Sequence, residues 1–326
     1  MLSVFKSKIS ERFLKNGQNE KSLNLSFAQK FPRMSLHIAI VSYFSTGAYD
    51  TNTIDEDKLL SAILTEIGVS HEIHAWSDPK VDWSSFSHLL IKSTWDYFDY
   101  YPQFLQWIEK VKALGIPVLN DLDTIRWNSS KEYLLEIESK GFPTIAGLIL
   151  EKGSKPNLQK IQEKVTSDTI VVKPLVSGGA KNTLKIPISE WEIWEEKVTQ
   201  LVREEAFLAQ PFVKEVAAVG EYSLIFFNQQ FSHAVLKTPA KSDFRVQHYY
   251  GGTIQEIQPD SSLLDSAQNL INTFGKSTLY GRVDGVLIDG VFHLMELELI
   301  EPYLFLGLSD KAVPNYREAL KNRLMH

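Results

Sequence analysis

From Met34 onward, short apolar segments alternate with longer segments of helical periodicity, and this alternation is the feature that most constrains the fold. The first apolar segment spans 37–43 and is followed by a helical pattern over 56–67. The pattern then predicts strands near 71–75, 87–91 and 117–119 and a helix over 101–114. Such alternation with short loops is typical of a parallel sheet covered by helices. We therefore predict a front α/β domain over 34–126.

The pattern changes after Trp127, where strands become more frequent than helices. Helices are predicted near 129–140, 156–166, 189–203 and 261–275, and strands near 146–150, 169–173, 206–209, 222–228, 231–238, 282–288 and 291–299. Strands that follow one another in this way indicate α+β units. We expect a small central unit over 127–207 and a strand-rich C-terminal unit over 208–326.

Composition excludes several classes of protein. The chain has 326 residues, of which 44% are hydrophobic, enough for two or three packed units. Its net charge of −6 argues against general nucleic-acid binding, and no apolar run reaches the roughly 18 residues of a membrane span. The absence of cysteine excludes disulfides, thiolate metal sites and a cysteine nucleophile. We expect a cytoplasmic protein without nucleic-acid or membrane partners. The sequence leaves open whether the chain forms a homo-oligomer.

Residues 1–33 differ from the rest of the chain. They contain seven Lys and Arg residues but only two glutamates, and they lack the apolar core of a secretory signal. We interpret them as a disordered tail or as translation from an upstream start. A transit-like peptide is the alternative.

An acidic hairpin carries the strongest local chemistry. Two alternating segments flank Asp289-Gly290, and Glu296 and Glu298 share one face of the second strand because side chains alternate. A two-residue turn would place Asp284 on the opposite face from both glutamates. A three-residue loop that pairs Leu287 with Val291 would place Asp284 beside them. We predict the three-residue loop.

Three carboxylates brought together in this way repel one another, and the single Arg282 would not balance them. Magnesium supplies the missing charge, prefers oxygen ligands and bridges nucleotide phosphates. We therefore predict a metal site at Asp284, Glu296 and Glu298. The alternative is a solvated acidic hairpin.

Basic residues next to turn-forming residues are candidates for phosphate binding. The sequence has neither a P-loop nor a strand-linked Gly-x-Gly-x-x-Gly. Instead, Lys173 ends a predicted strand and precedes a glycine-containing loop at 177–183. Lysine and backbone N–H groups in such a loop can hold phosphate oxygens, although an ordinary surface loop is the alternative. Lys237 and Arg245 add two cations further along the chain.

Taken in order, these segments resemble the ATP-grasp superfamily, and the likeness covers nearly all of 37–307. It implies an α/β front domain and two α+β subdomains that clasp a nucleotide. By this resemblance, Lys131 and Lys173 contact the phosphates and the loop with Ser177, Gly178 and Gly179 closes over them. The resemblance further implies an adenine site at Gln210, Pro211, Phe212 and Val213, with Glu215 and Glu221 as ribose candidates.

The resemblance also implies the catalytic and metal residues. Lys237-Thr-Pro and Arg245-x-Gln247, followed by Gly251-Gly252, are similar to the basic segment of glutathione synthetase and of ligases that add glutamate to a ribosomal protein. Lys237 and Arg245 are thereby implied to be catalytic, and Arg282 is similar to an arginine that faces the transferred phosphate in D-alanine–D-alanine ligase. Asp284, Glu296 and Glu298 match the magnesium triad, with Mn²⁺ as an alternative metal, although the third ligand in the family is usually Asn.

Within the superfamily, the sequence is most similar to the branch that includes the cyclising synthetase of cycloserine biosynthesis. The shared segments are 93–97, 220–223, 233–237, 244–247 and 295–302. This likeness implies a ligase or cyclising synthetase that activates a carboxylate of an amino-acid-like or small-peptide substrate with ATP. A phosphotransferase of the same fold and a non-catalytic nucleotide-binding regulator are the alternatives.

Substrate contacts are expected where the front domain meets the nucleotide site. Ligands of α/β sheets bind at the carboxyl ends of strands, and Trp95 and Asp96 follow the strand predicted near 87–91. Packing of Trp95 in a domain interface is the alternative. The further candidates are Gln247, Tyr250, Gly251, Gly252 and Glu301.

Overall fold

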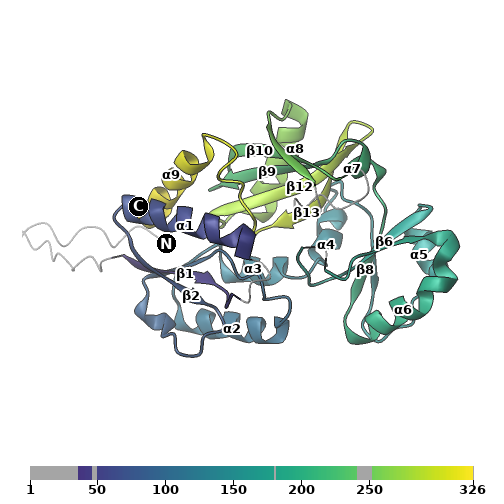
Figure 1. Cartoon of the computed structure of the whole chain (residues 1–326), viewed down its shortest axis with the longest axis horizontal. Helices are drawn as coiled ribbons and strands as arrows, with labels where there is room; N and C mark the ends of the chain where they lie inside the picture. Colours follow the sequence, from purple (N-terminus) through teal and green to yellow (C-terminus); the bar gives the residue numbers. More distant parts are fainter. Residues whose placement is uncertain (1–35, 46–49, 180, 241–251, 326) are drawn as a thin grey trace, which may run out of the picture. The chain divides into compact units, whose positions relative to one another are not determined.

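The structure is a computed structural model that describes residues 36–45, 50–179, 181–240 and 252–325. Three β-sheets organise these residues, with the strand orders β2-β1-β3-β4, β5-β8-β6-β7 and β11-β10-β9-β12-β13. Figure 1 shows helices packed around each of them. The expected combination of α/β and α+β architecture is confirmed. None of the helices in the described ranges is long and apolar enough to span a membrane.

The first sheet is parallel and is formed by β1 (His37–Ser42), β2 (Ser70–Ala75), β3 (His88–Ile91) and β4 (Val118–Leu119). Its central strand is buried on both faces, as expected for a parallel sheet. Ile38 and Ile40 pack against α1 (Asp50–Glu66) and α9 (Ala312–Leu324), whereas Ala39 and Val41 pack against α2 (Tyr101–Leu114). Helix α2 has the predicted bounds, and the left-handed Gly115 ends it.

The second sheet is antiparallel and is formed by β5 (Leu148–Leu150), β6 (Thr169–Pro174), β7 (Leu184–Pro187) and β8 (Phe207–Pro211). Helices α5 (Leu158–Lys164) and α6 (Trp191–Glu204) share an apolar core with one face of this sheet. Short 3₁₀ turns occur at Trp83–Ser85 and Ile188–Glu190. Strand β6 ends next to the glycine-containing loop, so the sheet presents Lys173 at the edge of that loop.

The segment between the first two sheets contains two short helices, α3 (Leu122–Asn128) and α4 (Tyr133–Ser139), in place of one helix over 129–140. Lys131 lies in the break between them, and its backbone N–H donates to the Leu175 carbonyl at 2.9 Å. The helix is interrupted because a bond to a distant segment replaces a bond within the helix. The break places Lys131 beside the loop that follows β6.

The third sheet is antiparallel and is formed by β9 (Glu221–Phe227), β10 (Gln230–Thr238), β11 (Thr253–Ile257), β12 (Tyr280–Ile288) and β13 (Val291–Glu298). Helix α8 (Ser261–Phe274) packs on one face, and α9 packs on the other. The short helix α7 (Lys214–Ala218) joins β8 to β9. The core beneath α9 also includes Ile38 and Ile40, so the first and third sheets share one apolar core.

The three-residue loop predicted for the acidic hairpin is wrong. Ile288 pairs with Val291, which leaves a two-residue turn. Asp289 and Gly290 have φ angles of 50° and 78°, the left-handed values that a type I′ turn requires. This turn matches the right-handed twist of the strands better than the loop we expected.

A β-bulge nevertheless produces the side-chain arrangement that was predicted. The register shifts between Asp284 and Gly285, so that Asp284 pairs with Glu296 while Gly285 pairs with Leu294. Met295 is therefore the extra residue, and the bulge moves Asp284 onto the face of the glutamates. A Cβ atom on Gly285 would lie 2.4 Å from the His293 carbonyl oxygen, which explains why glycine stands at the bulge.

Candidate functional site

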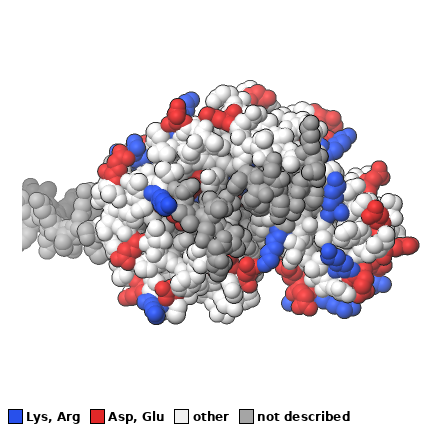
Figure 2. Space-filling model, viewed as in Figure 1, with Lys and Arg blue, Asp and Glu red and all other residues white. Residues whose placement is uncertain are grey.

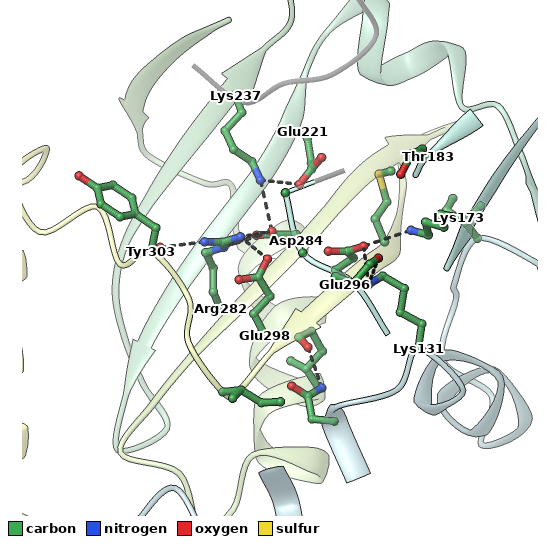
Figure 3. A pocket seen from close by; sticks show the side chains of 18 of the residues that line it. Lys131, Lys173, Thr183, Glu221, Lys237, Arg282, Asp284, Glu296, Glu298 and Tyr303 are labelled. Carbon is green, nitrogen blue, oxygen red and sulfur yellow. Dashed lines mark hydrogen bonds and ion pairs between the residues drawn. The ribbon is translucent and has the colours of Figure 1, made fainter. Parts of the chain in front are cut away.

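One pocket of about 300 Å³ is lined by strands of the second and third sheets and by loops, including the segment 95–98 that follows β3 of the first sheet. Figure 3 shows charged side chains pointing into it from β6, β9, β10, β12 and β13. The charged residues that line it are Lys131, Lys173, Glu221, Lys237, Arg282, Asp284, Glu296, Glu298 and Glu301. Residues that are distant in the sequence thus converge on a single space, as the proposed nucleotide site requires.

Asp284 is the most strongly bound carboxylate of the pocket. It accepts hydrogen bonds from Arg282 Nε at 3.0 Å and Nη2 at 2.8 Å, from Ser223 Oγ at 2.6 Å and from Lys237 Nζ at 3.2 Å. Burial alone would raise the pKa of Asp284, but Arg282 and Lys237 outweigh burial and hold this pKa below its ordinary value. Asp284 is therefore a permanent anion that fixes Arg282 and Lys237.

Glu296 faces two lysines on the other side of the pocket. Its Oε1 lies 3.1 Å from Lys173 Nζ and 4.0 Å from Lys131 Nζ. Burial opposes its ionisation, yet the two lysines lower the pKa of Glu296 to about 2. In Figure 3, these lysines stand on one side of the carboxylate row and Arg282 and Lys237 on the other.

The pKa of Glu298 shifts in the opposite direction to that of Glu296. Arg282 Nη2 contacts Glu298 closely, but Arg282 also serves Asp284. Burial, together with the negative charges of Asp284 and Glu296, raises the pKa of Glu298 to about 7 despite Arg282. Glu298 thus shares its single cation with Asp284, and a further cation beside Glu298 would stabilise its ionised form.

The residues fit a magnesium ion only in part. Within the part of the chain that the structure describes, no three His, Asp or Glu side chains are grouped to hold a metal alone. Asp284 is already occupied by Arg282 and Lys237. Glu296 and Glu298 share one face of β13, and magnesium in nucleotide sites typically uses one or two carboxylates plus phosphate oxygens. The donor set therefore fits a metal shared with a nucleotide.

Lys131, which was predicted to contact phosphates, lies against the loop after β6. Lys131 is buried, and its Nζ donates to the Ser177 carbonyl at 2.7 Å. Burial lowers the pKa of Lys131, and Glu296 opposes this effect. Gly178 lies against Phe98, so closely that a Cβ atom there would be 2.7 Å from the ring. Gly178 and Gly179 both line the pocket, as does Ser177.

The expected adenine segment lines an apolar end of the pocket. Gln210, Pro211, Phe212 and Val213 all line it. Gln210 is buried, and its Nε2 donates to the Ile145 carbonyl at 2.8 Å. The apolar side chains at this end are Ile145, Val171, Val213, Val216 and Met295. A flat aromatic base fits such a lining, because apolar side chains can cover its faces while a few polar groups pair with its edge.

The two ribose candidates differ in position. Glu221 lines the pocket and accepts a hydrogen bond from Lys237 Nζ at 2.5 Å. Burial raises the pKa of Glu221, and Lys237 opposes it. Glu215, on α7, is not among the residues that line the pocket.

Only some of the substrate candidates line the pocket. Trp95 and Glu301 line the pocket, whereas Asp96 and Gly252 do not. The Asp96 carboxylate instead accepts a hydrogen bond from Trp76 Nε1 at 2.6 Å inside the front domain. The predictions for Arg245, Gln247, Tyr250 and Gly251 lie outside the described residues.

Sequence reasoning assigned no role to several residues that shape the site. Ser223 binds Asp284, and the Tyr133 hydroxyl accepts a hydrogen bond from the Leu297 N–H at 3.0 Å. Asn128 donates to the Leu297 carbonyl at 2.7 Å and accepts from the Leu299 N–H at 2.9 Å. Ser223 could have been found, because it alternates with Glu221 along β9. Asn128 and Tyr133 form hydrogen bonds with the backbone of β13 and of Leu299, more than 160 residues further along the chain. No spacing pattern in the sequence indicates these contacts.

The comparisons with known proteins agree with this geometry. Residues 38–120 match the family model described as D-cycloserine synthetase DcsG, N-terminal domain. The cycloserine biosynthesis protein DcsG of Streptomyces lavendulae is 28% identical over 286 residues, which cover 83% of this chain and 94% of that protein. The crystal structure of D-cycloserine synthetase DcsG superposes with a TM-score of 0.76 at 26% identity, covering 88% of this chain and 99% of DcsG.

The chain is an ATP-grasp ligase. D-alanine–D-alanine ligase from Bacillus anthracis shares the fold of this ATP-grasp ligase, with a TM-score of 0.65 at 14% identity over 89% of this chain and 96% of that enzyme. The expected superfamily, its similarity to the DcsG branch and the expected class of enzyme are thereby confirmed. ATP-grasp ligases form C–N bonds and use ATP with magnesium.

Proposed function

We propose that this ATP-grasp ligase joins a carboxylate of an amino-acid-like or small-peptide substrate to an amine, through an acyl phosphate. The product is either linear or cyclic. The observation that carries the proposal is the convergence of four cations and a row of carboxylates in one pocket that also has an apolar end. The similarity to DcsG, a cycloserine biosynthesis protein, and to D-alanine–D-alanine ligase supports the amino-acid class of substrate.

The nucleotide is proposed to lie with adenine between Val213 and Met295 and with its phosphates between the two groups of cations. Lys131 and Lys173 approach from one side, and Lys237 and Arg282 from the other. Arg245, outside the described residues, is proposed as a further catalytic cation on the basis of the resemblance alone. Fixed cations of this kind stabilise charge that develops on the transferred phosphoryl group.

Magnesium, or manganese, is proposed to be held by Glu296 and Glu298 together with phosphate oxygens, with Asp284 nearby. When bound, the metal neutralises phosphate charge and orients the terminal phosphoryl group. The pKa of Glu298, raised to about 7, supports this placement, because a cation there restores the ionised carboxylate.

The proposed reaction has two steps. A substrate carboxylate oxygen attacks the γ-phosphorus, the bond between that phosphorus and the β–γ bridging oxygen breaks, and ADP leaves. The amine nitrogen then attacks the acyl carbon, inorganic phosphate leaves with the C–O bonding electrons, and the amine releases a proton. The residues of this chain position the groups and offset negative charge, and no protein nucleophile is required.

ADP release during a screen of amino acids and small peptides tests the proposal. A ligase releases both ADP and phosphate with formation of an amide or a cyclised product. A phosphotransferase would instead retain the phosphoryl group on its product. ATP binding without ADP release under any substrate would favour a nucleotide-binding regulator. The proposal also includes a cytoplasmic location, which fits the cysteine-free sequence.

Two substitutions test the assigned roles. Glu296→Gln removes the charge that faces the lysines, and Arg282→Lys keeps a charge but loses the paired donors to Asp284. We expect each to lower the rate of ADP formation by about 100-fold or more, as loss of one fixed electrostatic contact commonly does. Glu132→Gln, at an exposed residue beside Lys131, is the matched control and should retain the wild-type rate. Wild-type rates for Glu296→Gln would contradict the assignment.

A further inference from the structure

We propose that Glu301 binds an ammonium group of the substrate, so that the enzyme selects substrates with a free amino group. This inference rests on the ligase reaction proposed above and assigns to Glu301 the recognition of one chemical group. Four other acidic side chains line the same pocket: Glu221, Asp284, Glu296 and Glu298. Each of these four has a cationic partner from the protein.

Glu301 differs from the other four because none of the residues that the structure describes supplies it with such a partner. Among the described residues, no donor forms a hydrogen bond with its carboxylate and no cation pairs with it, although it is partly buried in the pocket wall. A carboxylate removed from water without a partner is costly, so its retention in a pocket indicates that a ligand supplies the partner.

The backbone on both sides of Glu301 is held in place. The Ile300 carbonyl accepts a hydrogen bond from the Tyr280 hydroxyl at 2.7 Å, and the Pro302 carbonyl accepts one from Lys92 Nζ at 3.1 Å. The side chain therefore has little backbone freedom with which to reach a distant protein cation. Its position is fixed before any ligand binds, which is how a binding group is preorganised.

The electrostatic surroundings of Glu301 favour a positively charged group of the ligand beside its carboxylate. Burial, and then the charge of Glu298, raises the pKa of Glu301 to about 8, although Lys131, Arg282 and Lys92 act in the opposite direction. These three cations are thus too distant or too well paired to offset the burial. A positively charged ligand group beside the carboxylate would restore its ionised form.

The nearby side chains favour an ammonium group over a second metal ion. Burial, and then the charge of Glu301, raises the pKa of the buried Tyr97, and both side chains line the pocket. Trp95, Tyr97 and Phe98 line the same pocket. Aromatic faces attract organic cations, whereas magnesium requires several oxygen ligands.

The ammonium site lies next to the proposed phosphoryl-transfer site. Two residues after Glu301, the Tyr303 carbonyl accepts a hydrogen bond from Arg282 Nη1 at 2.8 Å, and Figure 3 shows this contact. Arg282 is proposed to face the transferred phosphoryl group. A small molecule that presents its carboxylate there could therefore reach Glu301 with an amino group on a neighbouring carbon.

A comparison of two ligands on two proteins tests the inference. The ligands are the amino acid that gives the fastest ADP release in the screen and its N-acetyl derivative, and the proteins are the wild type and Glu301→Gln. Their dissociation constants are measured by calorimetry with magnesium and a non-hydrolysable ATP analogue. Binding is measured in place of turnover because it reports recognition of the amino group separately from any effect of acetylation on the reaction steps.

We expect acetylation to weaken binding by about tenfold or more in the wild type and by less than about threefold in Glu301→Gln, a coupling of the kind that double-mutant cycles detect. ATP-analogue affinity and its magnesium dependence should be equal in both proteins, and Glu132→Gln should behave as the wild type. Melting temperatures show that each variant is folded.

Three results would overturn the inference. Equal effects of acetylation in both proteins would show that Glu301 does not bind the amino group. A changed magnesium dependence in Glu301→Gln would assign the carboxylate to a metal. If no amino acid or peptide causes ADP release by the wild type, the proposed function fails, and the inference fails with it.

Discussion

Glu296 and Glu298 stand two residues apart on β13, yet their pKa values shift in opposite directions, to about 2 and about 7. Glu296 meets two lysines, whereas Glu298 shares Arg282 with Asp284. The alternation of side chains along a strand made their common face predictable. The division of cations between them was not predictable, because it depends on which strands approach from elsewhere in the chain.

Glu301→Gln should change the pH dependence of stability. Burial raises the pKa of Glu301 from 4.5 to about 8, so the folded protein binds a proton there that the unfolded chain has lost. The free energy of unfolding therefore falls as pH rises from about 4.5 to about 8 because of this group. The substitution removes this contribution, so the melting temperature of the variant should exceed that of the wild type most clearly above about pH 8.

Melting temperatures of both proteins between about pH 5 and about pH 9, in nucleotide-free buffer, would measure this difference. Glu132→Gln is again the control, since Glu132 is exposed and should leave the pH profile unchanged. A constant difference between wild type and Glu301→Gln at all pH values would contradict the assigned burial of an unpaired carboxylate.

At the scale of elements, strands with strong apolar alternation were predicted well, whereas four short elements and the C-terminal helix were missed. The sequence did not predict α3, α7, α9, β7 or β11. Strands β7 and β11 are edge strands, which depend on one neighbour for their hydrogen bonds. The break before α4 is another example, because its cause is the bond from Lys131 to Leu175, far along the chain.

The bulge in the acidic hairpin is the element on which the site depends most. Gly285→Ala would force a Cβ atom to within 2.4 Å of the His293 carbonyl oxygen and 2.4 Å of the Phe292 ring. Relief of this clash requires a shift of β12 against β13, so we expect a loss of about 1–3 kcal/mol in the free energy of unfolding. ADP formation should fall by about tenfold or more, because the register of β12 against β13 sets the position of the Asp284 carboxylate in the pocket.

Gly290→Ala in the turn of the same hairpin is the matched control. Gly290 has a φ of 78°, but no atom lies within 4 Å of the position that a Cβ atom would take, so the cost is about 1 kcal/mol of backbone strain. ADP formation should remain at the wild-type level, because the turn does not contribute to the pocket lining. Equal loss of activity in both variants would show that ADP formation depends on the stability of the hairpin and not on the geometry of the bulge.

At the scale of the molecule, the site exists because the second and third sheets and the segment that follows β3 of the first sheet contribute to one pocket. Local spacing predicted that Glu296 and Glu298 share a face, whereas Asp284 joins them through a bulge that was not predicted. The meeting of Lys131, Lys173 and Arg282 was expected only from the resemblance to a known fold. Surface charge would not have located the site: on the face shown in Figure 2, acidic and basic side chains of the described residues are interspersed. The charged side chains of the site line the pocket.

A buried ion pair joins the first sheet to the segment that carries Glu301 and Tyr303. Lys92 Nζ, at the end of β3, lies 2.9 Å from Glu56 Oε2 on α1, and both side chains are 2% exposed. Glu56 also accepts hydrogen bonds from the N–H groups of Leu304 at 2.9 Å and Leu306 at 3.1 Å. The pair therefore fixes the position of this segment relative to the front domain.

Lys92→Met should destabilise the protein more than the double variant Lys92→Met/Glu56→Gln. The single change leaves the Glu56 carboxylate buried without its cation, at a cost of about 3–5 kcal/mol, whereas the neutral amide of the double variant avoids an unpaired charge. Urea unfolding of the wild type and both variants measures the free energies. A single variant as stable as the double variant would mean that the backbone N–H groups alone suffice for Glu56, and that the lysine does not anchor the segment.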